Sequence, residues 1–155
     1  MQNVMLRDAL VSDAGAILEI MVVAFEQYRD KLNPPSSVFR ETPESVSAKL
    51  ATGGGFVALV GDTMSGCVLY EPKTDYLYLG RLAVLPEYRG QGIARLLVTS
   101  VENHAQALNL PRIQLGVRVA LTDNQEFFAG LGYRIVSYER HPGHSEPTFV
   151  YMEKA

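Results

Sequence analysis

The sequence predicts an α/β fold of about seven strands with flanking helices. β-rich runs and segments of helical periodicity follow one another in the order β-α-α-β-β-β-α-β-α-β-β. A strand-like run at 76–85 passes through a glycine-containing turn into a helical pattern at 92–108 and then into a strand at 112–117, which is a βαβ crossover. At 155 residues the chain has the length of one domain with a sizeable core, so we expect residues 1–155 to form a single domain.

The first part of the chain predicts a strand and two helices. Residues 3–7 form the strand, and Ser12-Asp13 offers caps for a helix that ends at about Tyr28. The apolar face of this helix has the spacing of a buried stripe: Ile17, Ile20, Met21, Ala24 and Phe25. The prolines in 32–36 require a loop, and Thr42-Pro43 then supplies an N-cap and a first-turn proline for a helix over 43–51.

Three strands and a long helix are predicted in the middle. Strands at 56–60 and 65–70 are joined by Gly61-Asp62-Thr63, a hairpin signal. The strand at 76–85 alternates regularly until Gly80-Arg81 interrupts the pattern, as a β-bulge does. The helix over 92–108 has an apolar face predicted from its i, i+3 and i+4 spacing: Ile93, Leu96, Leu97, Ser100, Val101, His104 and Leu108.

The last part of the chain predicts a strand, a helix and a strand pair. The strand at 112–117 is followed by Thr122 to Gln125, which has the spacing of a capping box. The helix that it opens ends at Gly132, a residue suited to the left-handed conformation after a C-terminus. Strands at 133–140 and 148–153 complete the sheet, with a proline- and glycine-containing loop between them.

The composition excludes several classes of function. The net charge is −3 and no basic stripe is present, so we expect no nucleic-acid partner. Cys67 is the single cysteine, which excludes an internal disulfide, and its position in a strand predicts a buried side chain; we expect no metal site. No apolar run is long enough to span a bilayer and the N-terminus lacks a signal-peptide core, so we expect a cytoplasmic protein without membrane contact.

The turn between the strand at 76–85 and the next helix has the features of an anion site. The first amides of a helix lack intrahelical partners, and the helix dipole is positive there. Gly90 and Gly92 allow a phosphate to approach the backbone closely, and Arg89 adds a planar guanidinium. A plain glycine-capped turn is the alternative explanation for these residues alone.

The spacing Arg89-x-x-Gly92-x-Ala94 resembles the signature of the GNAT superfamily of acyl-CoA-dependent N-acetyltransferases. The sequence around it, Leu-Ala-Val-x-Pro-x-Tyr-Arg-Gly-Gln-Gly-Ile-Ala, is also similar to the family form. A Walker loop is excluded because no Gly-Lys-Ser/Thr follows, and the Rossmann glycine spacing is absent. The resemblance covers nearly the whole chain and is most specific from 77 to 133. It implies one N-acetyltransferase domain with a mostly antiparallel sheet and a splayed central parallel strand pair.

The resemblance also implies a binding site for acetyl-CoA. Pantetheine would lie between the strands at 76–85 and 112–117 and pair with the backbone of Leu82 and Val84. The bulge would direct an amide at the thioester carbonyl, and the pyrophosphate would lie on the amides of 91–95. Asn124 and Phe128 match positions that contact the cofactor; a helix start is the alternative for Asn124, and an exposed helix face is the alternative to a phosphate contact for Arg95. The predicted cofactor-binding residues are Leu82, Ala83, Val84, Arg89, Gly90, Gln91, Gly92, Ile93, Ala94, Arg95, Asn124 and Phe128.

Two positions depart from the family pattern. Phe128 occupies the place of a tyrosine acid that many members carry, and Tyr78 occupies the place of a glutamate base that some members carry. Tyr78 is the one predicted catalytic residue, with an ordinary strand aromatic as the alternative; neutral tyrosine is a poor base, since its pKa is about 10. A proton could also pass through water to Glu26 or His141, and positioning with an oxyanion donor could supply much of the rate.

The acceptor is expected to be a primary amine of a small molecule or a peptide. By resemblance its site lies between residues 25–35 and the 141–146 loop, which gives the predicted substrate-binding residues Phe25, Glu26, Tyr28 and His141. Glu26 and Asp30 could bind a cationic amine, and a solvated helix face is the alternative. A terminal strand with an uncovered edge would favour a homodimer.

Three hypotheses follow from the sequence. The first is an N-acetyltransferase that acts by direct attack of the amine in a ternary complex. The second is a CoA-binding sensor or interaction module without turnover, which Phe128 and Tyr78 motivate. The third is an unrelated α/β nucleotide binder, which stabilisation by ATP or NAD but not by CoA would indicate.

Overall fold

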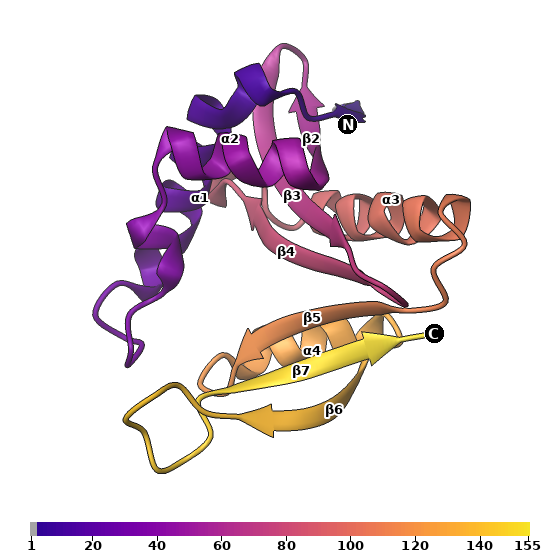
Figure 1. The fold of residues 1–155 in the computed structure, drawn as a ribbon. Helices are drawn as coiled ribbons and strands as arrows, with labels where there is room; N and C mark the ends of the chain where they lie inside the picture. Colours follow the sequence, from indigo (N-terminus) through magenta and orange to yellow (C-terminus); the bar gives the residue numbers. More distant parts are fainter. Residues whose placement is uncertain (1–2) are drawn as a thin grey trace.

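The computed structural model describes residues 3–155, and within this range the chain forms one seven-stranded sheet in the order β1-β2-β3-β4-β5-β7-β6 (Figure 1). The strands are β1 Val4–Asp8, β2 Gly54–Val60, β3 Thr63–Pro72, β4 Leu77–Val84, β5 Ile113–Arg118, β6 Arg134–Glu139 and β7 Phe149–Lys154. The helices are α1 Ala14–Phe25, α2 Pro43–Thr52, α3 Ile93–Ala107 and α4 Thr122–Gly130, with 3-10 turns η1 Val11–Asp13, η2 Glu26–Tyr28, η3 Ser37–Arg40 and η4 Pro86–Tyr88. The predicted fold class and the order of its main elements are confirmed.

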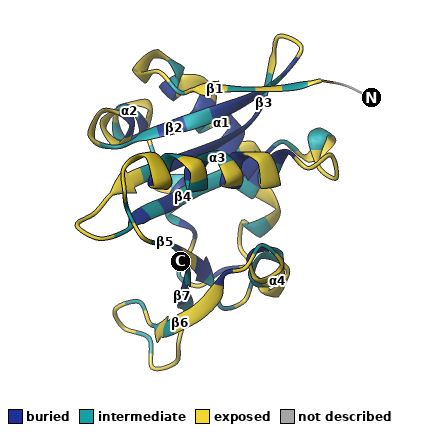
Figure 2. Cartoon of the chain, turned by 90° about the vertical axis from the view of Figure 1, so that its right-hand side faces the viewer, coloured by how far each residue is buried: buried dark blue, intermediate teal, exposed yellow. Residues whose placement is uncertain are grey.

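The helices cover both faces of the sheet and divide its core in two. The buried side chains of α1 and α2 pack with Val57, Cys67 and Leu69 on one face. The side chains of α3 and Phe128 of α4 pack on the opposite face. In Figure 2, α3 presents exposed residues outward and lies over strands whose residues are mostly buried. Cys67 is fully buried as predicted, and desolvation raises the pKa of its thiol to about 12.

The parallel strands β4 and β5 separate along their length. They pair at Leu77–Ile113 and at Tyr78–Gln114 and then diverge, whereas every other neighbouring pair is antiparallel. The register of β3 against β4 shifts between the Leu69–Gly80 and Cys67–Ala83 pairs, which inserts one extra residue in β4. Arg81 lies in this bulge at φ 55°, so both the predicted bulge and the predicted splay are confirmed.

The buried stripe of α3 differs from the predicted one. Leu96 and Leu108 were expected to face the core, but they are 42% and 41% exposed. The buried residues are instead Ile93, Leu97, Val98, Val101 and Ala105. The stripe is thus turned toward Val98 and Ala105, which belong to the core cluster that α3 forms with the strands of the sheet.

The ends of two helices also differ from the prediction. The predicted continuous helix over 12–28 is α1 with a 3-10 turn at each end. Thr122 is the first residue of α4 rather than its N-cap, so the predicted capping box is wrong. Gln125 Nε2 of the side chain instead donates to the carbonyls of Arg118 and Val119. At the other end Gly132 adopts φ +100°, and the amides of residues 132 and 133 cap the helix as predicted.

The sheet edges are β1 and β6. The last strand of the chain, β7, lies between β5 and β6, so the expectation of a terminal edge strand is wrong. Because β6 forms the edge of the sheet, β7 is paired on both sides, with β5 and with β6. Among residues 3–155 no helix combines the length and the apolar character that a bilayer crossing requires.

Candidate active site

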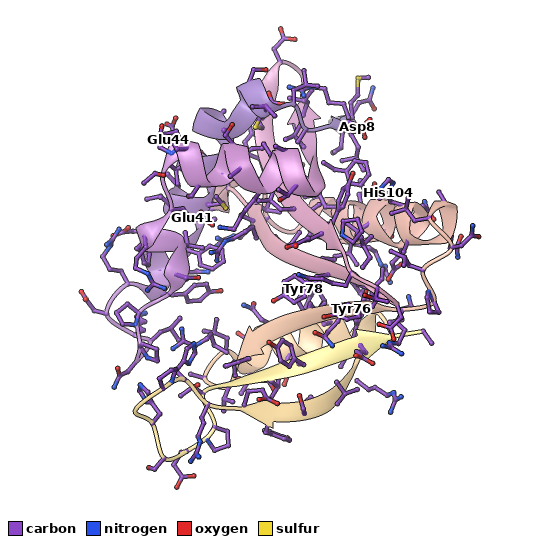
Figure 3. All side chains as sticks on the ribbon, in the orientation of Figure 1. Asp8, Glu41, Glu44, Tyr76, Tyr78 and His104 are labelled. Carbon is purple, nitrogen blue, oxygen red and sulfur yellow. The ribbon has the colours of Figure 1, made fainter. Side chains whose placement is uncertain are left out.

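A cavity of about 910 Å³ lies where β4 and β5 separate, and it continues to the connector between α1 and α2 and to the loop between β6 and β7. Figure 3 shows Tyr78 in the opening between the two strands. The predicted site residues that line the cavity are Phe25, Tyr28, Tyr78, Leu82, Ala83, Val84, Arg89, Ala94, Asn124, Phe128 and His141. The two segments predicted to bind the acceptor are far apart in the sequence, yet both border the same cavity as the strand predicted to bind the cofactor.

The backbone of β4 presents an unpaired edge to this cavity. The Leu85 amide donates to the Ser65 carbonyl, on the β3 side. Because successive strand amides point to opposite edges, those of Val84 and Leu82 are directed toward the separated edge. The Val84 carbonyl on this edge accepts a hydrogen bond from Arg89 Nε at 3.3 Å. The two amides that the sequence selected thus remain on the side where a ligand with spaced amides could pair.

The cavity reaches the N-terminus of α3 through Ala94. The first bond of the helix runs from Leu96 N to Gly92 O, so the amides of residues 93–95 have no intrahelical acceptor, and no side chain of residues 3–155 caps them. Gly90 and Gly92 both adopt φ +80°, and within the described chain a Cβ on either would meet no atom within 4 Å. The space next to these amides is open, which suits a phosphate.

The remaining predicted residues of this turn do not line the cavity. Gly90, Gln91, Gly92 and Arg95 lie on the exposed turn and the first helical turn beside it. The Ile93 side chain is 1% exposed and packs in the core, so its backbone alone could face a ligand.

Arg89 has a different place from the one predicted for its side chain. Its guanidinium donates to Ala24 O at 3.0 Å and to Gln27 Oε1 at 3.1 Å, besides Val84 O. Ala24 lies in the last turn of α1, where a cation is favoured by the helix dipole. The side chain therefore joins α1 to β4, and it is not turned to a phosphate on α3.

Glu26 also lies apart from the other predicted acceptor residues. Its carboxylate pairs with Arg29 at 2.8 Å and is 56% exposed, and it does not line the cavity. Phe25 and Tyr28 do line the cavity, and their rings contact edge to face at 5.6 Å. The end of α1 thus presents aromatic rather than acidic side chains to the acceptor space.

Tyr78 and His141 are two of the cavity residues whose pKa is shifted. Burial, with a smaller contribution from Tyr151, raises the pKa of Tyr78 against the opposing charge of Arg81. Its phenol stays protonated at neutral pH, so it can donate a proton but cannot act as a base. Burial and the charges of Arg118, His144 and Arg40 lower the pKa of His141, which keeps its ring neutral and able to accept a proton.

Phe128 is buried and has no donor group, and Asn124 lies one helical turn before it. The Phe128 ring packs edge to face on Phe127 and on Tyr133. The nearby Tyr133 hydroxyl donates to Glu102 at 2.9 Å, and burial strongly raises its pKa. The hydroxyl of Tyr133 is thus hydrogen-bonded to α3 and does not line the cavity.

A buried ion network that the sequence did not predict supports the bulge. The Glu41 side chain is 2% exposed and accepts from Arg81 Nε at 2.8 Å, from Lys49 Nζ at 2.9 Å and from Ser45 Oγ. Arg81 and Lys49 line the cavity, and Figure 3 shows Glu41 on the side of the sheet that α1 and α2 cover. No local pattern marked Glu41, because its arginine partner is 40 residues away.

Comparisons with known proteins agree with this geometry. Residues 17–133, well over half of the chain, match the Acetyltransferase (GNAT) family. An uncharacterized N-acetyltransferase of Halalkalibacterium halodurans, BH2580, is 34% identical over 82 residues, which are 53% of this chain and 44% of that relative. The chain thus spans less than half the length of this curated relative.

Solved structures show the same fold at low sequence identity. PaiA N-acetyltransferase from Thermoplasma acidophilum, in complex with coenzyme A, is 16% identical with a TM-score of 0.81, and 98% of each chain is covered. Arabidopsis thaliana Naa50, in complex with the bisubstrate analogue CoA-Ac-MVNAL, is 20% identical with a TM-score of 0.77, again with 98% of each chain covered. From the family match and the architecture that these structures share, the chain belongs to the Acetyltransferase (GNAT) family.

Proposed function

We propose that this protein is an N-acetyltransferase that transfers the acetyl group of acetyl-CoA to a primary amine by direct attack in a ternary complex. The observation that carries the proposal is the shared cavity, which joins the unpaired edge of β4 to the open N-terminus of α3. Family membership supports the acetyl transfer, and the coenzyme A complex of the PaiA structure supports the cofactor.

The residues of this chain fit the parts of that cofactor. The amides of Leu82 and Val84 would pair with pantetheine, and the amides of residues 93–95 would bind the pyrophosphate beside Gly90 and Gly92. Acetyl-CoA supplies an activated thioester when it is bound. The protein would hold the amine beside it and exclude water, which is the contribution of orientation.

Proton transfer is assigned to two cavity residues. Tyr78 keeps its proton and would donate it toward the leaving sulfur, a different role from that of a base. His141 is neutral and would accept the proton of the ammonium, directly or through water. Cys67 is excluded as a covalent nucleophile, since it is fully buried and its thiol stays protonated.

The function is tested by incubating the protein with acetyl-CoA and a panel of primary amines and measuring thiol release. Release that depends on the amine supports the enzyme. Tight binding of acetyl-CoA without release for any amine would support a sensor module instead, the alternative that Phe128 motivates. Absence of coenzyme A binding would contradict both.

Replacing Gly92 by alanine should raise the Kd for coenzyme A about tenfold, because a Cβ would fill the open space beside the helix amides through which the phosphate would approach. The Kd is measured by titration calorimetry. Gly61→Ala is the matched control, since Gly61 also has positive φ with open surroundings but lies in the β2–β3 turn. Equal losses of affinity in the two variants would contradict a phosphate site at Gly92.

Replacing Tyr78 by phenylalanine should lower kcat about 100-fold, the low end of what a positioned proton donor contributes. The KM for acetyl-CoA should change little, because the ring stays in place. Tyr76→Phe, in the turn immediately before β4 and outside the cavity lining, is the control for the loss of a hydroxyl. An unchanged kcat in Tyr78→Phe would remove Tyr78 from the chemistry.

A further inference from the structure

The wall of the cavity carries an excess of positive charge. Its cationic lining residues are Arg40, Lys49, Arg81, Arg89 and Arg118, while Glu71 is the only carboxylate in the lining among the described residues. Glu71 is itself paired with Lys73 and half exposed. The sequence offered Glu26 and Asp30 either as partners of a cationic amine or as a solvated helix face, and the cavity lining is instead mostly cationic.

Three of the five cationic side chains already have partners within the protein. Lys49 and Arg81 pair with Glu41, and Arg89 is held by carbonyl groups and by Gln27. Two cations remain, Arg40 and Arg118, and neither forms an ion pair within residues 3–155. Both lie at the acceptor end, near Pro34 and the 141–149 segment that lines it.

The two arginines differ in burial: Arg40 is exposed, whereas Arg118 has a buried polar atom without a partner among the described residues. Arg118 is the last residue of β5, at the end where the strand has moved away from β4. Its guanidinium donates through one terminal nitrogen to Pro34 O, but its Nε is buried and has no hydrogen-bond partner in the described chain. Burial lowers its pKa without an acid to offset it. Such a group is costly unless a ligand anion completes it.

Arg40 and Arg118 line the same cavity. The charges of both arginines act on the His141 ring, which lines the same end of the cavity. Tyr28, Pro34 and Phe149 add apolar surface there. Two guanidinium groups beside a neutral imidazole and an apolar wall form a pocket for a compact anion on a small molecule.

We propose that the amine acceptor carries an anionic oxygen group, a carboxylate or a phosphate, which Arg118 and Arg40 bind while the amine is directed toward Tyr78. This inference rests on the proposed acetyl transfer and specifies its substrate class. The expected substrates are therefore amino acids and phosphorylated amines. Polyamines are disfavoured because the cationic wall repels them. Amines without an anionic group are disfavoured because they leave Arg118 unpaired.

The experiment compares amines that differ only in the anionic group. Suitable pairs are glycine with glycinamide, 4-aminobutyrate with butylamine, and O-phosphoethanolamine with ethanolamine. If the site binds a carboxylate, kcat/KM should be about 30-fold higher for glycine and 4-aminobutyrate than for their neutral counterparts, and if it binds a phosphate, about 30-fold higher for O-phosphoethanolamine than for ethanolamine, as expected for a charged hydrogen bond. The carboxylate pairs and the phosphate pair distinguish the two sources of charge.

Two variants test the residues. Arg118→Gln and Arg40→Gln should each remove most of the preference for the anionic member, while the Kd for acetyl-CoA stays unchanged. Lys31→Gln is the control, because Lys31 is an exposed cation of the same connector that does not line the cavity. If Arg118→Gln fails to fold, Arg40→Gln decides. Retention of the preference in folded Arg40→Gln and Arg118→Gln would overturn the assignment.

The outcome separates this inference from the proposed function. Equal or faster acetylation of the neutral members would overturn the anion site and leave the acetyltransferase intact. If no amine is acetylated, the acetyltransferase proposal fails, and calorimetry of the coenzyme A complex with each amine pair decides the anion site. Preferential binding of an anionic member that Arg118→Gln abolishes would support the site, and equal binding of both members would overturn it.

Discussion

Replacing Glu41 by alanine is expected to lower the free energy of unfolding by about 3 kcal/mol, since it removes a buried carboxylate and leaves Arg81, which is 21% exposed, without its ion-pair partner. The Glu41 side chain is 2% exposed and forms ion pairs with both Arg81 and Lys49. Urea unfolding followed by circular dichroism measures the change. Glu44→Ala is the control, because Glu44 is an exposed acid in the first turn of α2.

The same change should lower kcat, because Arg81 lies in the bulge of β4 in a left-handed conformation. A side chain other than glycine holds such a conformation only where its surroundings fix it. The pair with Glu41 is the contact that ties Arg81 to the segment before α2. A variant whose stability lies within about 0.5 kcal/mol of the wild type and whose kcat is unchanged would show that the network does not support the bulge.

The pH dependence of stability gives an independent measure of Glu41. Burial alone would raise the pKa of this carboxyl, but its hydrogen bonds from Ser45 and Lys49 and the charge of Arg81 outweigh burial and lower the pKa below the ordinary value of 4.5. The stabilisation is therefore complete above pH 4.5 and is lost as the pH falls through the lower folded value. Glu41→Gln should show a shallower loss of stability over this acid range.

Most of the fold was predictable because its signals are local. The bulge is an example, since Gly80-Arg81 breaks the strand alternation at the residues that are displaced in the structure. The glycine turn before α3 is another, because positive φ at Gly90 and Gly92 requires the residue type that the sequence shows. The centre of the α3 stripe was not predictable in the same way, since periodicity gives the spacing of a face and the sheet determines which neighbours it buries.

The candidate site was predictable for backbone groups and less so for side chains. Leu82, Val84 and the α3 amides follow from the strand and helix that contain them. Arg89 shows the limit, because its partner Ala24 lies 65 residues away and nothing local indicates that contact. Arg118 gave no sequence signal at all, since its importance comes from the lack of an acid around it in three dimensions.

Replacing Gly53 by alanine should be among the most damaging small changes in the chain, lowering the free energy of unfolding by about 3 kcal/mol. A Cβ at Gly53 would lie 2.1 Å from the Tyr70 carbonyl oxygen and 3.1 Å from Glu71 Cα. These are backbone atoms, and the next residue, Gly54, pairs with Tyr70 across β2 and β3, so the strand has little freedom to move away.

The matched control for Gly53 is Gly15→Ala in α1, where a Cβ would meet no atom within 4 Å among the described residues. Alanine is the better helix former, so that variant should gain about 0.5 to 1 kcal/mol. Urea unfolding of both variants measures the difference. A loss of less than about 1 kcal/mol in Gly53→Ala would mean that β3 can shift at Tyr70, and the cavity wall formed by Tyr70 and Glu71 would then be more adaptable than the packing indicates.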